Sequence, residues 1–418
     1  MLNPSARWIE EVVQQHADMS ALLGQIRSTM VHAPHVKLHH LARLDERLAA
    51  HLDGLSVAGE FGVQLCAAAL EAPGVGEMFS AAVLALDQGD AARMDKLLSI
   101  ALALPSTQHG VVLAFNWVSA ASLRGITRDL LASGDAFRRM AGLAACNFHL
   151  IDAGRALDAA LADGEASLRA VALRIAGERG RVDLLPTCVD LMQDEDADCR
   201  FWAAHSAVLL GDRRAAVKAL HETATMPGVH RERSLALLLK LLTSARGAGV
   251  LQPLIADPLS AHLAIRGLGT LGDVHFVPWL IDKMTDRLWA RLAGEAFSSI
   301  TGVDLQMLDL DAKPPEDVDA EPDGNALAWD ASDDLPWPSA AKVSRWWASN
   351  AQRFAPGTRY FMGEPLSVAL CLRTQKEGYQ RQREAAVAYL CLLMPGTPMF
   401  NTAAPAWRQK RWLDAMQG

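Results

Sequence analysis

The sequence predicts an all-α fold, in the form of a solenoid of stacked helix pairs. Two observations support this prediction: a composition rich in helix-forming residues, and a segment that recurs every 31 residues. Half of the 418 residues are hydrophobic and 21% are charged, so the chain has enough apolar side chains to fold. Leucine and alanine dominate and tyrosine occurs 3 times, which is typical of packed helices and not of a β-sandwich. A chain of this length exceeds one compact core and needs several domains or a repeat array.

An arginine followed by a stretch rich in alanine and leucine occurs four times at a constant interval. Arg138, Arg169, Arg200 and Arg231 are each 31 residues apart. A small residue stands three places after each arginine, where two helices can approach closely: Ala141, Ala172, Ala203 and Ser234. A set of unrelated helical domains would not explain why the same interval of 31 residues is kept over four steps. The pattern indicates a solenoid of the HEAT kind, although its period is shorter than the roughly 40 to 47 residues usual for HEAT units.

Each period also contains a second helical stretch. Residues 182–192 have apolar side chains at intervals of three and four, and turn-forming dipeptides separate the stretches. The helix pairs are therefore predicted to occupy residues 59–303, which exceeds the about three repeats that a solenoid needs. The acidic run at residues 194–198 lies at one of the turns and lacks the glycine and final glutamate of a calcium loop. We expect it to be a solvated helix start.

Both ends of the chain are predicted to be helical caps. Residues 1–58 include an amphipathic helix at residues 38–55, with four leucines on one stripe: Leu41, Leu44, Leu48 and Leu52. Residues 339–418 resume helical order after an N-cap serine, Ser339, and end in a basic and aromatic tail. We expect these caps to close the array.

The acidity of the protein is concentrated in one segment. Residues 304–334 hold eleven acidic residues and one lysine, a charge of −10 against −8 for the whole chain, which leaves +2 elsewhere. Prolines prevent regular secondary structure in the region 304–338, which is therefore predicted to be an acidic linker or loop. The plainer interpretation is a solvated spacer. The functional one is a surface that attracts a basic partner, because clustered charge raises association rates and large aromatic residues often anchor interfaces. On that interpretation the partner-binding residues are Asp317, Asp319, Glu321, Asp323, Trp329, Asp333, Asp334 and Trp337.

No catalytic, cofactor or metal site is predicted. The sequence contains no GxSxG, HExxH or Walker A motif. His35 and His39 have a spacing that suits a metal, but no Glu or Cys completes a recognisable pattern beside them. The six cysteines are scattered without a CxxC pair, which indicates buried thiols in a reducing cytosol. The N-terminus has no apolar signal region and no stretch is long enough to cross a bilayer, so we expect a cytoplasmic protein without a membrane partner.

Several segments resemble a known family. Residues 41–55, the HEAT-like centre and the C-terminal motifs Gly363-Glu-Pro365, Arg383-Glu-Ala-Ala and Arg408-Gln look like a bacterial family of uncharacterised HEAT-repeat proteins. Its members are often encoded among type VI secretion genes, and the resemblance covers nearly the full length. It supplies no catalytic residues. It implies a setting, since proteins encoded beside secreted antibacterial effectors tend to be immunity proteins, chaperones or adaptors.

Two hypotheses keep the protein non-enzymatic. In the first it is an immunity protein that binds a secreted effector toxin, most simply a nuclease whose basic cleft the acidic segment occupies as a phosphate mimic. In the second it is an adaptor or chaperone that loads an effector onto the secretion apparatus. HEAT arrays commonly bind through their inner helices, so Asp190 and Asp282 are further predicted partner-binding residues.

A third hypothesis is a DNA glycosylase of the HEAT-like kind. It would use Trp202 with Arg200, or Trp279 with Asp282, beside a damaged base. The charge of +2 outside the acidic segment argues against it, because phosphate binding needs a basic surplus on one face. We therefore expect no nucleic-acid partner.

Overall fold

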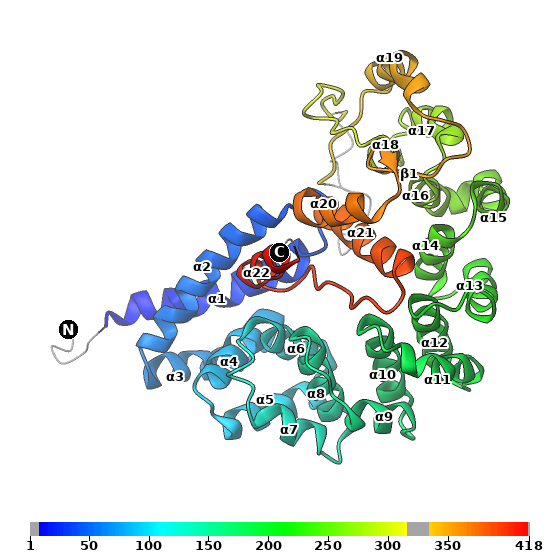
Figure 1. The fold of residues 1–418 in the computed structure, drawn as a ribbon. Helices are drawn as coiled ribbons and strands as arrows, with labels where there is room; N and C mark the ends of the chain where they lie inside the picture. The colour runs from blue at the N-terminus through cyan, green and yellow to red at the C-terminus, as the bar shows by residue number, and fades with distance from the viewer. Residues whose placement is uncertain (1–7, 316–333, 417–418) are drawn as a thin grey trace. The chain divides into compact units, whose positions relative to one another are not determined.

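A computed structural model of the chain describes residues 8–315 and 334–416, which are predominantly helical (Figure 1). By their contacts these residues form two units. The first consists of residues 8–32, 36–206 and 396–416, and the second of residues 33–35 and 207–395. The prediction of an all-α solenoid is confirmed.

The first unit begins with long helices and continues into short helix pairs. Its α-helices are α1 (Glu10–Met30), α2 (Leu38–Val57), α3 (Glu60–Ala69), α4 (Val75–Asp87), α5 (Ala91–Ala103), α6 (Gln108–Trp117), α7 (Ile126–Leu131), α8 (Ala136–Phe148), α9 (Arg155–Leu161), α10 (Ala166–Glu178), α11 (Leu185–Asp190), the first part of α12 (Ala197–Leu209), and α22 (Ala406–Ala415). The stripe of four leucines predicted in α2 is buried. The second stretch predicted at residues 182–192 is a broken helix, because α11 lies between 3₁₀ helices at Val182–Leu184 and Leu191–Gln193. A further 3₁₀ helix in this unit is Pro105–Thr107.

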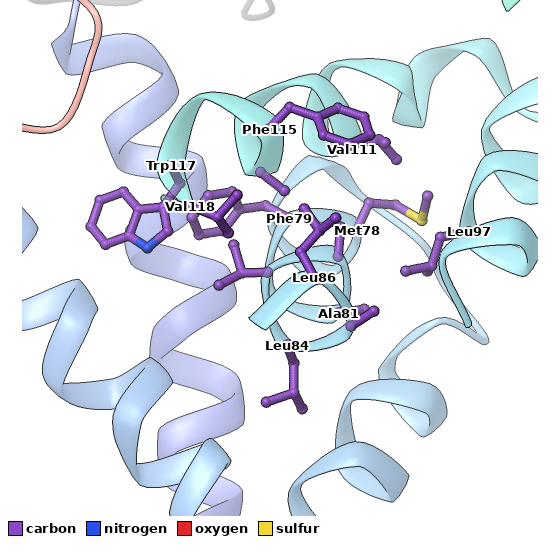
Figure 2. Close-up of a cluster of buried hydrophobic side chains, with 14 of the residues drawn as sticks. Met78, Phe79, Ala81, Leu84, Leu86, Leu97, Val111, Phe115, Trp117 and Val118 are labelled. Carbon is purple, nitrogen blue, oxygen red and sulfur yellow. The ribbon is translucent and has the colours of Figure 1, made fainter. Parts of the chain in front are cut away.

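Helix α4 forms the centre of the first unit's core. It is apolar around most of its circumference, so neighbouring helices cover it on several sides. Figure 2 shows Met78 and Phe79 of α4 beside Val111 and Phe115 of α6. Phe79 also meets the ring of Trp117 edge to face, with 5.8 Å between ring centroids.

The C-terminal segment returns to the first unit, where α22 packs against α2 (Figure 1). Asp45 of α2 accepts hydrogen bonds from Arg27 of α1 at 2.6 Å and from the backbone N–H of Ala406 at 2.7 Å. Arg408, which is 4% exposed, donates to the carbonyls of residues 116, 117 and 118 at the end of α6. Residues 396–416 thus belong to the same unit as the N-terminal helices, whereas residues 339–395 belong to the other.

The helices led by arginine form as predicted, and they begin at residues 136, 166, 197 and 231. The four small residues three places after the arginines are buried. One register was wrong: the counterpart of Arg169 is Arg139, not Arg138. Arg139 donates to the turn carbonyls of residues 133 and 134, just as Arg169 donates to those of residues 163 and 164. Arg138 instead pairs with Asp95 on α5.

The first two arginines of the series also reach the next turn. Arg139 pairs with Asp163 at 3.1 Å, and Arg169 binds both carboxylate oxygens of Asp194 at 3.0 and 2.9 Å. Arg200 donates to the carbonyls of residues 194 and 195. We call the turns at residues 133–135, 163–165 and 194–196 the arginine–aspartate turns. Asp194 was expected to be solvated and is instead 6% exposed, and the Arg169 guanidinium lowers the pKa of its carboxyl group.

The second unit continues the array of helix pairs. Its α-helices are the rest of α12, α13 (Ala215–Thr225), α14 (Arg231–Leu241), α15 (Ser244–Ala256), α16 (Ala261–Leu271), α17 (Val277–Lys283), α18 (Ala290–Thr301), α19 (Ala340–Asn350), α20 (Val368–Glu377) and α21 (Gln380–Leu393). Its 3₁₀ helices are Pro258–Ser260, Val274–Phe276 and Ala351–Arg353. Helices α14 and α16 lie in one layer and α13 and α15 in a second layer beside it (Figure 1). Helix α18 packs on α16, so the first helices of three successive pairs are neighbours.

A short hairpin that the sequence did not predict joins the ends of these helices. Strands β1 (Tyr360–Phe361) and β2 (Glu364–Pro365) are antiparallel, and Met362 and Gly363 between them have φ of 51° and 83°, as a two-residue turn requires. Backbone N–H groups of residues 360, 362 and 363 donate to carbonyls of residues 272, 299 and 300. Arg359 donates to the carbonyls of residues 239, 240 and 242. The hairpin region therefore satisfies carbonyls at the C-terminal ends of α14, α16 and α18, which have no partner within their own helices.

Candidate interaction surfaces

The acidic segment leaves the second unit and rejoins it at one place. Leu305 and Leu310 are buried in the core of this unit, at 3% and 7% exposed. Ala312 donates its N–H to the carbonyl of Trp337, and Ser339 donates to that of Leu310, both at 2.8 Å. Residues 311 and 338 form an isolated β-bridge. The two described ends of the segment therefore share a common base, and we refer to the segment below as the acidic loop.

Three of the four described acidic residues at this base, all except Asp311, have a side-chain partner inside the protein. Asp304 accepts a hydrogen bond from the hydroxyl of Tyr379 at 2.9 Å, and burial together with this carboxylate raises the pKa of Tyr379 to about 12. Asp309 pairs with Lys342 at 3.0 Å. Asp334, one of the predicted partner-binding residues, lies 3.4 Å from His35. These carboxylates help to hold the base of the loop.

Trp337 is also part of this base. The Arg291 guanidinium lies over its ring at 5.6 Å from the centroid, and the neighbouring Pro338 packs near Gly294 of α18. The side chain is half-buried, so the ring is only partly available to a partner. The other predicted partner-binding residues of the segment lie outside the described residues: Asp317, Asp319, Glu321, Asp323, Trp329 and Asp333.

The two predicted residues on the repeats are both exposed. Asp190 is the last residue of α11 in the first unit, and Asp282 lies in α17 of the second. Neither carboxylate is buried beside a basic group that would fix its position. Their role in partner binding stays a prediction.

The tryptophans named for a glycosylase, Trp202 and Trp279, pack against other side chains of the protein. The Trp202 ring packs against Arg174, whose guanidinium lies 5.1 Å from the ring centroid, and against His205 at 5.1 Å between centroids. Arg200 is instead bound to the turn carbonyls described above. Trp279 packs against Lys283, whose amine lies 5.3 Å from its ring centroid, and not against Asp282. Nothing in these contacts supports the glycosylase hypothesis.

Successive turns of the second unit present exposed apolar side chains that sequence reasoning missed. They lie between α13 and α14, between α15 and α16, and between α17 and α18. We call the four residues the turn row: Met226, Val229, Leu259 and Leu288, which are 65%, 87%, 87% and 80% exposed. The signal was present in the sequence, because Pro227-Gly228 and Pro258 mark turns immediately before Val229 and Leu259.

The C-terminal motifs that carry the family resemblance have structural roles. Arg383 is fully buried and donates to the carbonyl of Gln375 at 2.6 Å and to the side chain of Gln380. Gln409, beside Arg408, donates to the carbonyls of residues 402 and 404. Gly363 lies in the hairpin turn against the end of α18. These residues hold helix ends and chain segments together.

The described residues contain no group of three or more His, Cys, Asp or Glu side chains that could hold a metal ion. All six cysteines are buried, and burial raises the pKa of the Cys188 thiol to about 12, which makes it a poor nucleophile. Among the helices of residues 8–315 and 334–416, none combines the length and apolar character needed to span a membrane.

Comparison with known proteins places repeats in the centre of the chain. Residues 155–239 match a family model described as HEAT repeats, a region that runs from α9 into α14. No curated protein matches the chain. The match supports a solenoid of the kind that binds other proteins.

Proposed function

We propose that the chain is a non-enzymatic binding protein that neutralises a secreted effector toxin, as an immunity protein of a type VI secretion system. The HEAT repeats support the broader part, since stacked helix pairs offer extended surfaces for polypeptides. The resemblance to a family encoded among type VI secretion genes supports the narrower part. A nuclease is the proposed effector, because a nuclease carries a basic cleft for its phosphate backbone.

The observation that carries this proposal is the acidic loop on a single base. The segment 304–334 holds eleven acidic residues and one lysine. Of its four described carboxylates, those of residues 304, 309 and 334 are engaged within the protein. Residues 316–333 hold seven further acidic residues, and these we assign to the partner. Clustered negative charge speeds the encounter with a basic cleft and discriminates against other surfaces.

The first experiment is a pull-down of the full-length protein with the products of neighbouring genes, followed by expression of each captured product in cells. An immunity protein restores growth when the effector is toxic. An adaptor leaves the toxicity unchanged and is needed for export of the effector. Growth that is not restored would contradict the immunity role.

The second experiment tests the loop. A variant with Asp317, Asp319, Glu321, Asp323 and Asp333 changed to their amides should bind the captured effector more weakly at low salt, and the difference should shrink as salt screens the charges. The matched control carries Asp129→Asn and Glu222→Gln, which remove exposed acids outside the loop and outside the other predicted partner-binding residues. Unchanged binding by the loop variant at both salt concentrations would reject the loop as the contact.

A further inference from the structure

Two histidines from different helices bring their ring nitrogens together in the first unit. His16 lies in α1 and His51 in α2, and these two helices pack against each other. The two Nδ1 atoms are 3.0 Å apart, and the ring centroids are 5.1 Å apart with an angle of 63° between the ring planes. Both side chains are half-buried, so solvent still reaches the pair. Two nitrogens that bind metals well therefore face one another across a helix contact.

A glycine of α2 makes room for one of the rings. A Cβ atom at Gly54 would lie 2.5 Å from Cδ2 and 2.6 Å from Nε2 of His16, closer than two such atoms can approach. Glycine within a helix costs stability relative to alanine, and here it leaves the space that an imidazole occupies. The His16 ring thus packs directly on the backbone of α2. This contact fixes its Nδ1 atom beside that of His51.

The distance between the two nitrogens suits a shared metal ion. Bonds from imidazole to a divalent metal such as zinc are about 2.0 to 2.1 Å long, so two nitrogens at cis positions 90° apart are separated by about 2.8 to 3.0 Å. At the tetrahedral angle the separation would be about 3.3 to 3.4 Å. The 3.0 Å between His16 and His51 lies at the edge of the first range. Cis positions of a square-planar or tetragonal ion are typical of Cu²⁺ and Ni²⁺.

The protonation of the pair is compatible with a metal ion. One imidazole donates its Nδ1–H to the Nδ1 of the other, and a metal ion takes the place of that shared proton. Burial, and secondly the charges of His16 and Arg47, lower the pKa of His51 below 6.5, so this ring is neutral at neutral pH. The Arg47 charge also opposes a nearby cation. It favours a metal that binds imidazole tightly, and Cu²⁺ leads the affinity series of first-row divalent metals.

We propose that His16 and His51 form a two-histidine site for a divalent transition metal ion, with Cu²⁺ preferred over Ni²⁺ and Zn²⁺. The ion bridges α1 and α2. The described residues place no third His, Cys, Asp or Glu side chain with the pair, so water fills the other coordination positions. The site belongs to the first unit and uses no residue of the acidic loop, so it does not rest on the proposed function.

The test is a titration of the chelator-treated, full-length protein with CuCl₂, followed by isothermal titration calorimetry. His16→Gln and His51→Gln should each weaken Cu²⁺ binding by at least about tenfold, because each removes one of two protein ligands. His39→Gln is the matched control, since His39 is exposed on the same helix, about 18 Å along the axis from His51. It should leave the affinity within about twofold. Electron paramagnetic resonance should show splitting from two nitrogens in the parent protein and from one in each single variant.

Two further variants keep both ligands. Gly54→Ala fills the space that the His16 ring occupies, so it should turn the ring away and weaken Cu²⁺ binding by about tenfold. Arg47→Gln removes the opposing charge and should tighten binding at low salt, with a smaller effect at high salt. Circular dichroism of each variant shows whether its helices are retained.

Four results would overturn the proposal. The first is the absence of saturable binding up to about 100 µM Cu²⁺. The second is an affinity of the variant with both His16→Gln and His51→Gln equal to that of the parent protein. The third is a loss of binding in His39→Gln, which would place the metal at other histidines. The fourth is tighter binding of Zn²⁺ than of Cu²⁺, which would contradict the cis geometry.

Discussion

The turns that join successive repeats are built differently in the two units. In the first unit, each arginine–aspartate turn gives its carbonyls to the guanidinium that follows, and Asp163 and Asp194 also bind the arginine of the preceding repeat. In the second unit, the corresponding turns end in Val229, Leu259 and Leu288, which project into solvent. In the first kind of turn, the backbone carbonyls and the aspartate carboxylates find their hydrogen-bond donors within the repeats. The second kind leaves apolar side chains exposed to solvent.

The second unit is held at the opposite ends of its helices. Arg359 and the hairpin bind carbonyls at the C-terminal ends of α14, α16 and α18. Tyr389 of α21 adds a hydrogen bond from its hydroxyl to the carbonyl of Thr270 at 2.7 Å. This difference indicates that contacts at one edge are sufficient to hold consecutive pairs together. The predictions below test each half of this comparison.

The largest effect is expected at the centre of the arginine–aspartate turns. Arg169→Ala leaves Asp194, which is 6% exposed, without its cation and leaves two turn carbonyls without their donor. Removing one member of a buried pair costs about 3 kcal/mol or more, so urea unfolding should show a loss of about 3 kcal/mol. Hydrogen exchange should locate the loss at the N-terminal ends of α10 and α12.

The control for this prediction lies on the same helix. Arg174 pairs with Glu178 and lies over the Trp202 ring, but its side chain is 53% exposed, so Arg174→Ala should cost only about 1 kcal/mol. If both alanine variants lose the same small amount, the arginine–aspartate turns do not hold the repeats together and the comparison fails.

A somewhat smaller effect is expected at the other edge of the second unit. Arg359→Ala removes a charged donor from three carbonyls at the end of α14 and should lower the free energy of unfolding by about 2 kcal/mol. Arg353→Ala is the matched control, since Arg353 is exposed and hydrogen-bonded only to Asn350 of its own turn among its described contacts. Equal stability of the two variants in urea would show that the hairpin region is not what holds this edge.

Local features of this molecule could be predicted from the sequence better than long-range ones. The leucine stripe of α2 and the repeating helices followed from side-chain periodicity, because the residues that share a helix face are set by sequence spacing. The partners of Arg359 and Arg408 could not be predicted, since a guanidinium binding backbone carbonyls over a hundred residues away leaves no pattern in either segment. The sequence also does not distinguish Arg138 from Arg139 as the arginine of the repeat, because both lie at the start of one helix. Only the structure shows that Arg139 binds the preceding turn and that Arg138 pairs with Asp95.

The candidate site was predictable only in its composition. The charge of the segment 304–334 is evident from the sequence, but its common base depends on hydrogen bonds between residues 310–312 and 337–339. The turn row shows the opposite case. Prolines and a glycine in the sequence mark two of its turns. The sequence does not show that the helices that follow these turns pack against one another.

A pH-dependent effect of intermediate size is expected at the end of α14. Burial, and secondly the charge of Arg359, lower the pKa of the Lys240 amine from 10.5 to about 8. Between about pH 8 and pH 10.5 the unfolded chain therefore binds more protons at this site than the folded chain, so stability rises with pH across that window. Lys240→Met removes the cost of the buried charge while keeping contact with the Tyr389 ring, over which the amine lies at 5.2 Å.

Lys240→Met should accordingly be more stable than the parent protein at pH 7, and its advantage should shrink as the pH approaches 10. Parallel urea titrations of both proteins at these two pH values measure the difference. Lys218→Met, at a side chain 82% exposed, should change stability by less than about 0.5 kcal/mol. An advantage of Lys240→Met that grows with pH would contradict the assignment.

The smallest effect on stability is expected where the turn row is changed. Leu259→Ser and Leu288→Ser alter side chains that already face solvent and keep the backbone hydrogen bonds that Asp257 and Asp286 accept in the same turns. Each substitution should shift the free energy of unfolding by less than about 0.5 kcal/mol. Leu263→Ser, one turn into α16 and 6% exposed, is the matched control and should cost about 2 kcal/mol or more, because it buries a hydroxyl in an apolar core. If Leu259→Ser destabilised the protein as strongly as Leu263→Ser, the apolar turns would belong to the fold. The contrast between the turns of the two units would then fail.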